Sequence, residues 1–145
     1  MTLETWFGLF NTLALVGWLL LAVFPRHPRT APLVTSVLIP ALLGVAYLVL
    51  LGLHFAGPNP QGDFSSLQGV TRLFADRRAL LAGWIHYLAF DLFIGSWQVR
   101  DAGRAGIPHL LVLPCLAVTF LFGPVGLLCY FAVRRLRGEP ASLSA

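Results

Sequence analysis

The chain has 145 residues, of which 57% are apolar and only 11% are charged, and its mean hydropathy is +0.78. A soluble domain carries about 25% charged residues, so this composition predicts a small all-α polytopic membrane protein. All ten basic residues are arginine, within a net charge of +4. No basic run is interleaved with aromatic residues, which argues against nucleic-acid binding and favours contact of short arginine-bearing loops with lipid headgroups.

Four apolar runs predict a four-helix transmembrane bundle, with spans at about 6–24, 33–55, 79–97 and 109–133. Each run approaches or exceeds the ~20 residues that cross a ~30 Å hydrocarbon core. Pro40 predicts a bend in the second span, and Gly123 with Pro124 predicts a bent or broken fourth span. We expect one transmembrane domain over 1–138 and a flexible tail over 139–145.

The connections between the later spans differ in character. Residues 64–78 carry apolar side chains at helical spacing and predict a short amphipathic helix on the membrane surface, capped by Asp63 or Ser65. Residues 98–106 read as a polar turn. Four spans place both termini on one side, and a split of six arginines against four weakly favours the cytoplasm for both.

The third run holds two ionisable groups, His86 and Asp91. An ionisable group at membrane depth costs at least ~2.5–3.5 kcal/mol and is a functional-site hypothesis by default. Helical geometry places Asp91 and Trp84 on one side of the helix, with Tyr87 and Gly95 next to them. His86 lies about 140° away from Asp91 around the helix axis. We expect no direct bond between the two groups, and a central position for this helix or an oligomer contact.

Simpler interpretations stay open for these residues. Asp91 can be a structural clamp to another helix, with Asn11 or Tyr130 as partner, and His86 a packing histidine bonded to a backbone carbonyl. Asn11 lies deep enough in the first span to need an interhelical partner. His109 opens the fourth run at interfacial depth, where contact with water and headgroups is the simplest expectation.

No metal or cofactor motif is evident. The four histidines include no pair at i, i+3 or i, i+4 spacing, which a helical metal-ligand pair requires. The chain has no nucleophile elbow, no glycine-rich phosphate loop and no CxxC. We therefore predict neither a metal nor a cofactor.

Three stretches carry a resemblance to a known family: Asn11 to Trp18, Gly83 to Trp97, and Gly106 to Gly126. They resemble the neoxanthin-synthase-type family of four-span membrane proteins, named for an abscisic-acid-deficient plant protein. The similarity covers nearly the whole chain. Its most specific parts are the His86–Asp91–Gly95 block and the block from Pro108 to Pro124. With no transit peptide and a compact, lysine-free sequence, the chain is similar to a bacterial member, which implies a bacterial inner membrane.

The resemblance implies a role in converting violaxanthin to neoxanthin, an isomerisation without an external oxidant. An epoxide opens to an alcohol while a neighbouring polyene carbon loses a proton. In this hypothesis Asp91 is the acid and His86 the base, or the reverse. The epoxide oxygen would be oriented by Tyr87, Asn11 or His109. The expected substrate-binding residues are Trp84, Phe90, Phe93, Gly95, Trp97, Thr119 and Phe122.

A non-enzymatic function is the alternative. The chain would then be a carotenoid-binding, lipid-binding or accessory membrane protein. In either case we expect a hydrophobic isoprenoid or lipid ligand, contact with membrane lipids, and a possible homo-oligomer, with no nucleic-acid partner.

Overall fold

The computed structural model describes residues 1–57 and 62–137, so the tail expected at 139–145 lies outside the described residues. This described part contains helices and connecting turns, and no strand. The elements in chain order are α1 (Leu3–Val23), a π-helical segment η1 (Thr30–Leu38), α2 (Ile39–Phe55), α3 (Leu67–Ala75), α4 (Arg77–Arg104), α5 (His109–Phe122) and α6 (Pro124–Leu136).

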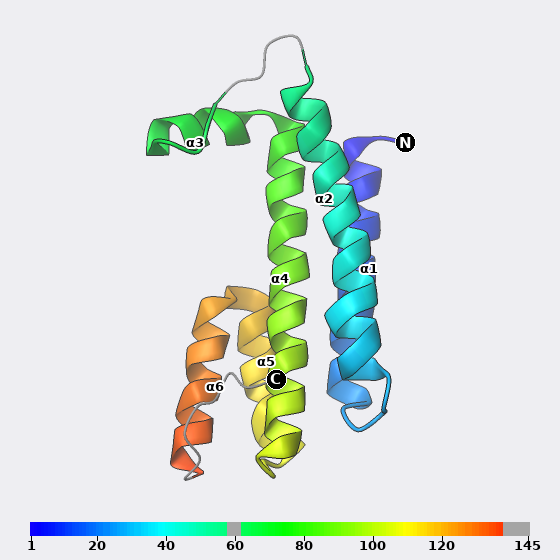
Figure 1. The fold of residues 1–145 in the computed structure, drawn as a ribbon, viewed down its shortest axis with the longest axis vertical. Coiled ribbons are helices and arrows are strands. Elements are labelled where there is room, and N and C mark those ends of the chain that lie inside the picture. The colour runs from blue at the N-terminus through cyan, green and yellow to red at the C-terminus, as the bar shows by residue number, and fades with distance from the viewer. Residues whose placement is uncertain (58–61, 138–145) are drawn as a thin grey trace.

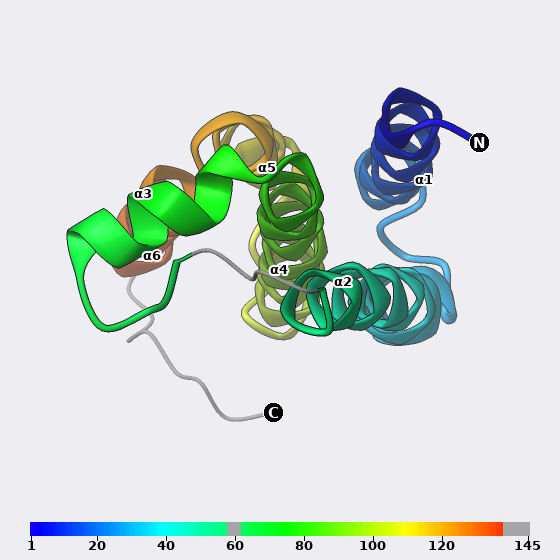
Figure 2. The same ribbon diagram turned by 90° about the horizontal axis from the view of Figure 1, so that it is seen from above.

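Three helical stretches of the described chain have the length and composition to cross a membrane. They are Leu3–Val23, Thr30–Phe55 and Arg77–Arg104, with 21, 26 and 28 residues. They run side by side, and α4 lies between the other elements, with contacts to α1, α2, α3, α5 and α6 (Figures 1 and 2). The expected central position of the helix that carries Asp91 is therefore confirmed.

The expected fourth span is divided into two helices. Gly123 adopts φ +46°, and Pro124, which has no backbone N–H, starts α6. This combination ends one helix and starts another in a new direction. At 14 residues, α5 extends only ~21 Å, short of a ~30 Å core.

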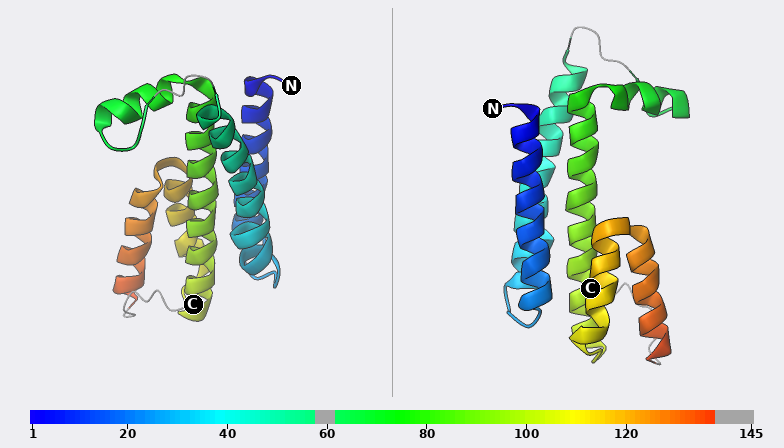
Figure 3. Two further views of the ribbon diagram at one scale, coloured as in Figure 1. Left: turned by 45° about the horizontal axis from the view of Figure 1, so that its top comes forward. Right: turned by 180° about the vertical axis from the view of Figure 1, so that it is seen from behind.

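The two short helices form an antiparallel hairpin beside the C-terminal half of α4 (Figures 1 and 3). The four-span bundle is thus not confirmed; three candidate spans and a helical hairpin take its place. As a consequence, the start of α1 and the end of α6 lie at opposite ends of the molecule (Figure 1).

The second span is π-helical up to Leu38, just before Pro40, where the sequence predicts a bend. Proline cannot donate a backbone hydrogen bond, so the carbonyl of Ser36, four residues before Pro40, lacks its α-helical donor. Two hydroxyls in the preceding segment bond to the backbone five residues earlier. The hydroxyl of Thr35 donates to the carbonyl of Thr30 at 3.0 Å, and that of Ser36 donates to the carbonyl of Ala31. These five-residue steps accompany the wide turns of η1 before α2 begins.

The residues predicted as a polar turn after the third span are mostly helical. α4 continues to Arg104, because polar side chains in this stretch find partners inside the protein. Gln98 and Asp101 are buried, and Asp101 accepts a hydrogen bond from Tyr130 at 2.6 Å. Hydropathy alone cannot separate a solvated turn from a helix whose polar groups are paired.

The surface helix between spans 2 and 3 is present but shorter than expected. α3 covers Leu67–Ala75 and lies across one end of the bundle (Figures 1 and 3). Its cap is Ser66, which accepts from the amide of Gly69 at 3.0 Å, rather than Asp63 or Ser65. Asp63 instead accepts from the amide of Ser65 at 2.8 Å.

Candidate functional site

Asp91 lies on α4 against the tip of the α5–α6 hairpin. A Cβ at position 123 would lie 2.9 Å from Oδ1 of Asp91, so the glycine that turns the hairpin also makes room for the carboxyl group. The other oxygen, Oδ2, is buried and has no hydrogen-bond partner among the described residues. A buried polar atom without a partner is rare and needs an explanation. A ligand that supplies the missing hydrogen bond is one.

Polar and aromatic groups continue from Asp91 along α4 towards α1. The hydroxyl of Tyr87 donates to the carbonyl of Phe120 at 3.0 Å, and its ring lies 5.3 Å from that of Trp84. The indole N–H of Trp84 donates to Oδ1 of Asn11 at 3.1 Å. The interhelical bond expected for Asn11 is therefore present, and its partner is Trp84 rather than Asp91.

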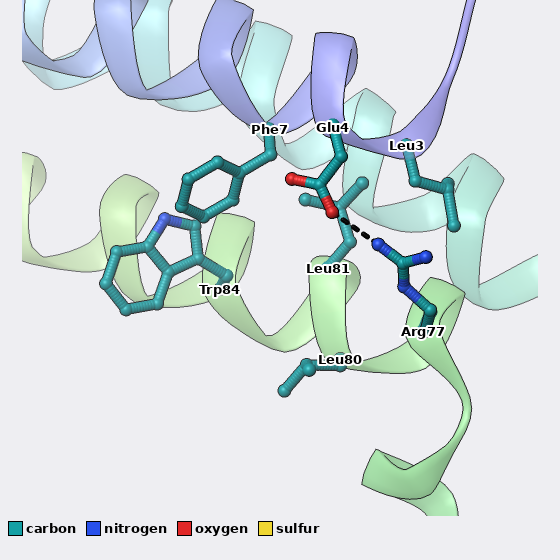
Figure 4. A pocket seen from close by; sticks show the side chains of 7 residues that line it. All are labelled: Leu3, Glu4, Phe7, Arg77, Leu80, Leu81 and Trp84. Carbon is teal, nitrogen blue, oxygen red and sulfur yellow. Dashed lines mark hydrogen bonds and ion pairs between the residues drawn. The ribbon is translucent and has the colours of Figure 1, made fainter.

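A pocket opens between α1 and α4 at the end of this row (Figure 4). Its volume is about 280 Å³, and the rings of Phe7 and Trp84 form one side of it. Glu4 and Arg77 form an ion pair across its edge, and both side chains are largely exposed. The pocket is therefore apolar at the Trp84 side and charged at the Glu4–Arg77 edge.

His86 faces a different flank of α4. Its side chain is exposed, and its ring lies 4.5 Å from the ring of Phe90 and 5.6 Å from that of Tyr47 on α2. An apolar groove of about 520 Å³ follows this flank, lined by Pro40, Gly44, Tyr47, His86, Ala89, Phe90 and Phe93. A smaller cavity of about 230 Å³ also includes Tyr47 and His86 and reaches Phe74 of α3. The expected acid and base thus lie on separate flanks, and His86 shares its groove with Phe90 and Phe93.

The other residues expected at the site are dispersed. Gly95 does not open space for a ligand, because a Cβ there would lie 2.6 Å from the ring of Trp18. Trp97 packs its ring 5.5 Å from Tyr130, on the side of α6. Phe122 is 62% exposed beside the hairpin tip.

Thr119 and His109 serve the packing of α5. Thr119 donates to the carbonyl of Cys115 at 2.8 Å, and its hydroxyl also accepts from Gln98 at 3.0 Å. His109 lies 3.0 Å from the carbonyl of Ala22 at the far end of α5. Since 14 residues of helix separate it from Gly123, ~21 Å lies between His109 and the neighbourhood of Asp91.

Sequence reasoning missed a buried carboxylate on α4, that of Asp101. Asp101 pairs with the buried Arg134 of α6, at 2.8 Å between Oδ2 and Nε, and also accepts from Tyr130. Tyr130 was a possible partner for Asp91, but its hydroxyl binds Asp101. The i, i+3 spacing of Gln98 and Asp101 places both on one helical face and was the available signal.

No metal-binding group of three or more His, Cys, Asp or Glu side chains occurs among residues 1–57 and 62–137.

The three long apolar helices have the length and composition of membrane-spanning helices, which is compatible with a helical membrane protein. The family model described as "ABA DEFICIENT 4-like" matches residues 5–130, and the chain belongs to this family. "Protein ABA DEFICIENT 4, chloroplastic" of Arabidopsis thaliana is 27% identical over 136 residues, which cover 90% of this chain and 60% of that relative. The chain thus spans about 60% of that relative's length. No solved structure matches the chain.

Proposed function

We propose that this protein binds an oxygenated isoprenoid of the carotenoid class and contacts its polar end through Asp91. The observation that carries the proposal is the unpaired Oδ2 of Asp91 at the hairpin tip. A hydroxyl or epoxide group, placed there by an otherwise apolar ligand, supplies the absent partner. Membership of the ABA DEFICIENT 4-like family supports the carotenoid class.

The proposed reaction is the isomerisation of an epoxy-carotenoid to an allenic alcohol. Because His86 lies on the other flank of α4, we assign both proton transfers to Asp91. In its protonated form the carboxyl donates its proton to the epoxide oxygen as one C–O bond breaks. Its second oxygen accepts the proton lost by the neighbouring polyene carbon. The carboxyl ends in the state in which it began, so no external acid, base or oxidant is needed.

The neighbours of Asp91 then have positioning roles. The hydroxyl of Tyr87 is bonded to the carbonyl of Phe120, and its ring lies against that of Trp84, whose indole N–H is bonded to Asn11. These contacts fix two aromatic surfaces on the flank of Asp91, and the pocket at Phe7 and Trp84 offers an apolar entrance from the membrane. The groove at His86 offers a second apolar surface, suited to a polyene or a lipid chain.

A non-catalytic binding or accessory protein is the competing function. The observation in its favour is that His86, the expected second acid–base group, lies on the other flank of α4, against Tyr47 and Phe90, rather than beside Asp91. Grooves lined mainly by apolar groups, such as that at Phe90 and Phe93, suit binding equally well.

An assay with purified protein distinguishes the isomerase from the binding protein. The protein is incubated in detergent with violaxanthin as the epoxy-carotenoid, and the pigments are separated by chromatography and identified by mass. Formation of an isomeric product of equal mass, without another polypeptide, supports the isomerase. Retention of unchanged pigment supports the binding protein. If folded protein neither converts nor retains the pigment, the carotenoid class is contradicted.

We further propose an orientation in the membrane. Seven of the ten arginines lie at the end of the molecule that holds the α1–η1 loop, the end of α4 and the end of α6. The excess of basic residues marks the side that is not translocated. The end of α6 is therefore assigned to the non-translocated side and the start of α1 to the other side. This differs from the expectation of both termini on one side, because the hairpin turns back.

A further inference from the structure

The two ends of the helical bundle differ sharply in charge. The basic end carries Arg26, Arg29, Arg100, Arg104, Arg134, Arg135 and Arg137. Among the described residues its one acidic side chain is Asp101, which is 4% exposed and turned inward to Arg134 and Tyr130. At the opposite end, three arginines are matched by Glu4, Asp63 and Asp76. The basic end therefore presents positive charge, and no exposed acidic side chain of the described residues offsets it.

A pocket of about 330 Å³ opens at this basic end, between the α1–η1 loop and the turn from α4 to α5. The buried side chains of Val99, Ala102 and Ile107 form its apolar floor. Arg26 lines it from the loop and His109 lines it from the start of α5. The pocket thus combines an apolar interior with a cationic edge, which matches the boundary between an acyl chain and a phosphate.

Two further features leave the pocket open to a ligand. Arg26 is exposed, and its guanidinium has no ion-pair or hydrogen-bond partner in the part of the chain that the structure describes. Gly103 lines the pocket, and a Cβ built there would meet no atom within 4 Å. His109, held at 3.0 Å from the carbonyl of Ala22, fixes the α5 side of the pocket against the end of α1.

We propose that this pocket binds the phosphate headgroup of an anionic phospholipid, with Arg26 as the main charged contact. Basic pockets between transmembrane helices are known to hold such headgroups. The site is separate from Asp91, at the other end of the α5–α6 hairpin. The lipid would bridge the α1–η1 loop and the α4–α5 turn, two connections that are distant in sequence.

The test uses the full chain in nanodiscs or micelles and counts bound lipids by native mass spectrometry. Dioleoyl phosphatidylglycerol is compared with dioleoyl phosphatidylcholine, which has the same chains and no net charge. Wild type is expected to retain one phosphatidylglycerol more tightly than phosphatidylcholine. Arg26→Ala should weaken that binding about fivefold, as expected for loss of one arginine near an anionic lipid. Arg78→Ala, which removes an exposed arginine at the opposite end, should leave it unchanged.

A second pair of variants tests the pocket independently of charge. Gly103→Leu places a side chain in the open space and should also weaken phosphatidylglycerol binding. Gly52→Leu on α2 is the matched control, since a Cβ there also meets no atom within 4 Å. Equal binding of the two lipids, or equal effects of Arg26→Ala and Arg78→Ala, would overturn the proposal. Displacement of the lipid by millimolar inorganic phosphate would reassign the pocket to a free phosphate ligand and also overturn it.

Discussion

Gly123 at the hairpin tip and Asp91 on α4 are in such close contact that a Cβ at position 123 would lie 2.9 Å from Oδ1 of the carboxyl group. The same glycine has φ +46°, which a side chain disfavours. The turn of the hairpin and the placing of the carboxyl therefore depend on the same residue.

Gly123→Ala is expected to lower both stability and function. Strain at positive φ and the clash with Asp91 should cost about 1–2 kcal/mol or more in the free energy of unfolding. The measurement is thermal unfolding in detergent, alongside carotenoid retention by the folded fraction. Gly8→Ala is the control: the site is helical and open, so replacing this glycine should stabilise by ~0.5–1 kcal/mol. An unfolding midpoint for Gly123→Ala at or above that of wild type would contradict the described contact.

The buried pair of Asp101 and Arg134 should hold the hairpin to α4. Arg134→Met leaves the Asp101 carboxylate buried without its counter-charge and should destabilise by ~3–5 kcal/mol. The double variant Asp101→Leu with Arg134→Met removes both charges and should cost much less than the sum of the single changes. Arg135→Met, at an exposed neighbour, should stay within ~0.5 kcal/mol. Additive effects in thermal unfolding would show that the two side chains do not act as a pair.

The three long helices could be predicted from the sequence, but the hairpin of α5 and α6 could not. Apolar length predicted α1, the helix ending at Phe55 and the helix carrying Asp91, because burial in lipid requires long helices. The same criterion counted His109 to Val133 as one span, since hydropathy does not record the direction in which a helix leaves Gly123. Asp91 was identified as a polar anomaly, but its contact with the hairpin tip depended on that missing direction.

The partner of the buried Asp101 carboxylate could not be predicted from the sequence either. Asp101 and Arg134 are 33 positions apart, and nothing local indicates that they meet. The separation of His86 from Asp91, in contrast, followed from helical geometry and needed no tertiary information.

Protonation of Asp76 should lower the stability of the fold at low pH. This residue caps α4 and lies just before the candidate span. The amide of Ala79, at 3.1 Å from Oδ1, is the main cause that lowers its pKa, and the amide of Arg78 and His54 contribute in the same direction. A carboxyl whose folded-state pKa lies below its ordinary value of 3.8 stabilises the fold above that pH. The contribution is lost as the pH falls through the lowered pKa.

Asp76→Asn checks this dependence, because asparagine keeps the helix cap but does not titrate. The unfolding midpoint is compared between about pH 6 and pH 3. We expect the difference between wild type and variant to narrow as the pH falls. A difference that stays constant over this range would exclude titration of Asp76 as its source.

The proposed orientation predicts that the start of α1 and the end of α6 are reached from opposite sides of the membrane. In a background with Cys115→Ala and Cys129→Ala, single cysteines are introduced as Thr2→Cys and Leu136→Cys, both at exposed positions. A membrane-impermeant maleimide added to intact bacterial cells should label Thr2→Cys at once and Leu136→Cys only after permeabilisation. Labelling of both from the same side would instead favour an even number of crossings.

The most direct measurement concerns Asp91 itself. Wild type, Asp91→Asn and His86→Ala are expressed in a host that accumulates violaxanthin, and the isomeric product is measured per folded protein. General acid–base catalysis contributes about 10²–10⁴-fold, so Asp91→Asn should reduce conversion by at least ~100-fold at unchanged protein level. His86→Ala, on the other flank of α4, should retain most of the activity. Undiminished product from folded Asp91→Asn protein would contradict the assignment of Asp91 as the group that handles the epoxide.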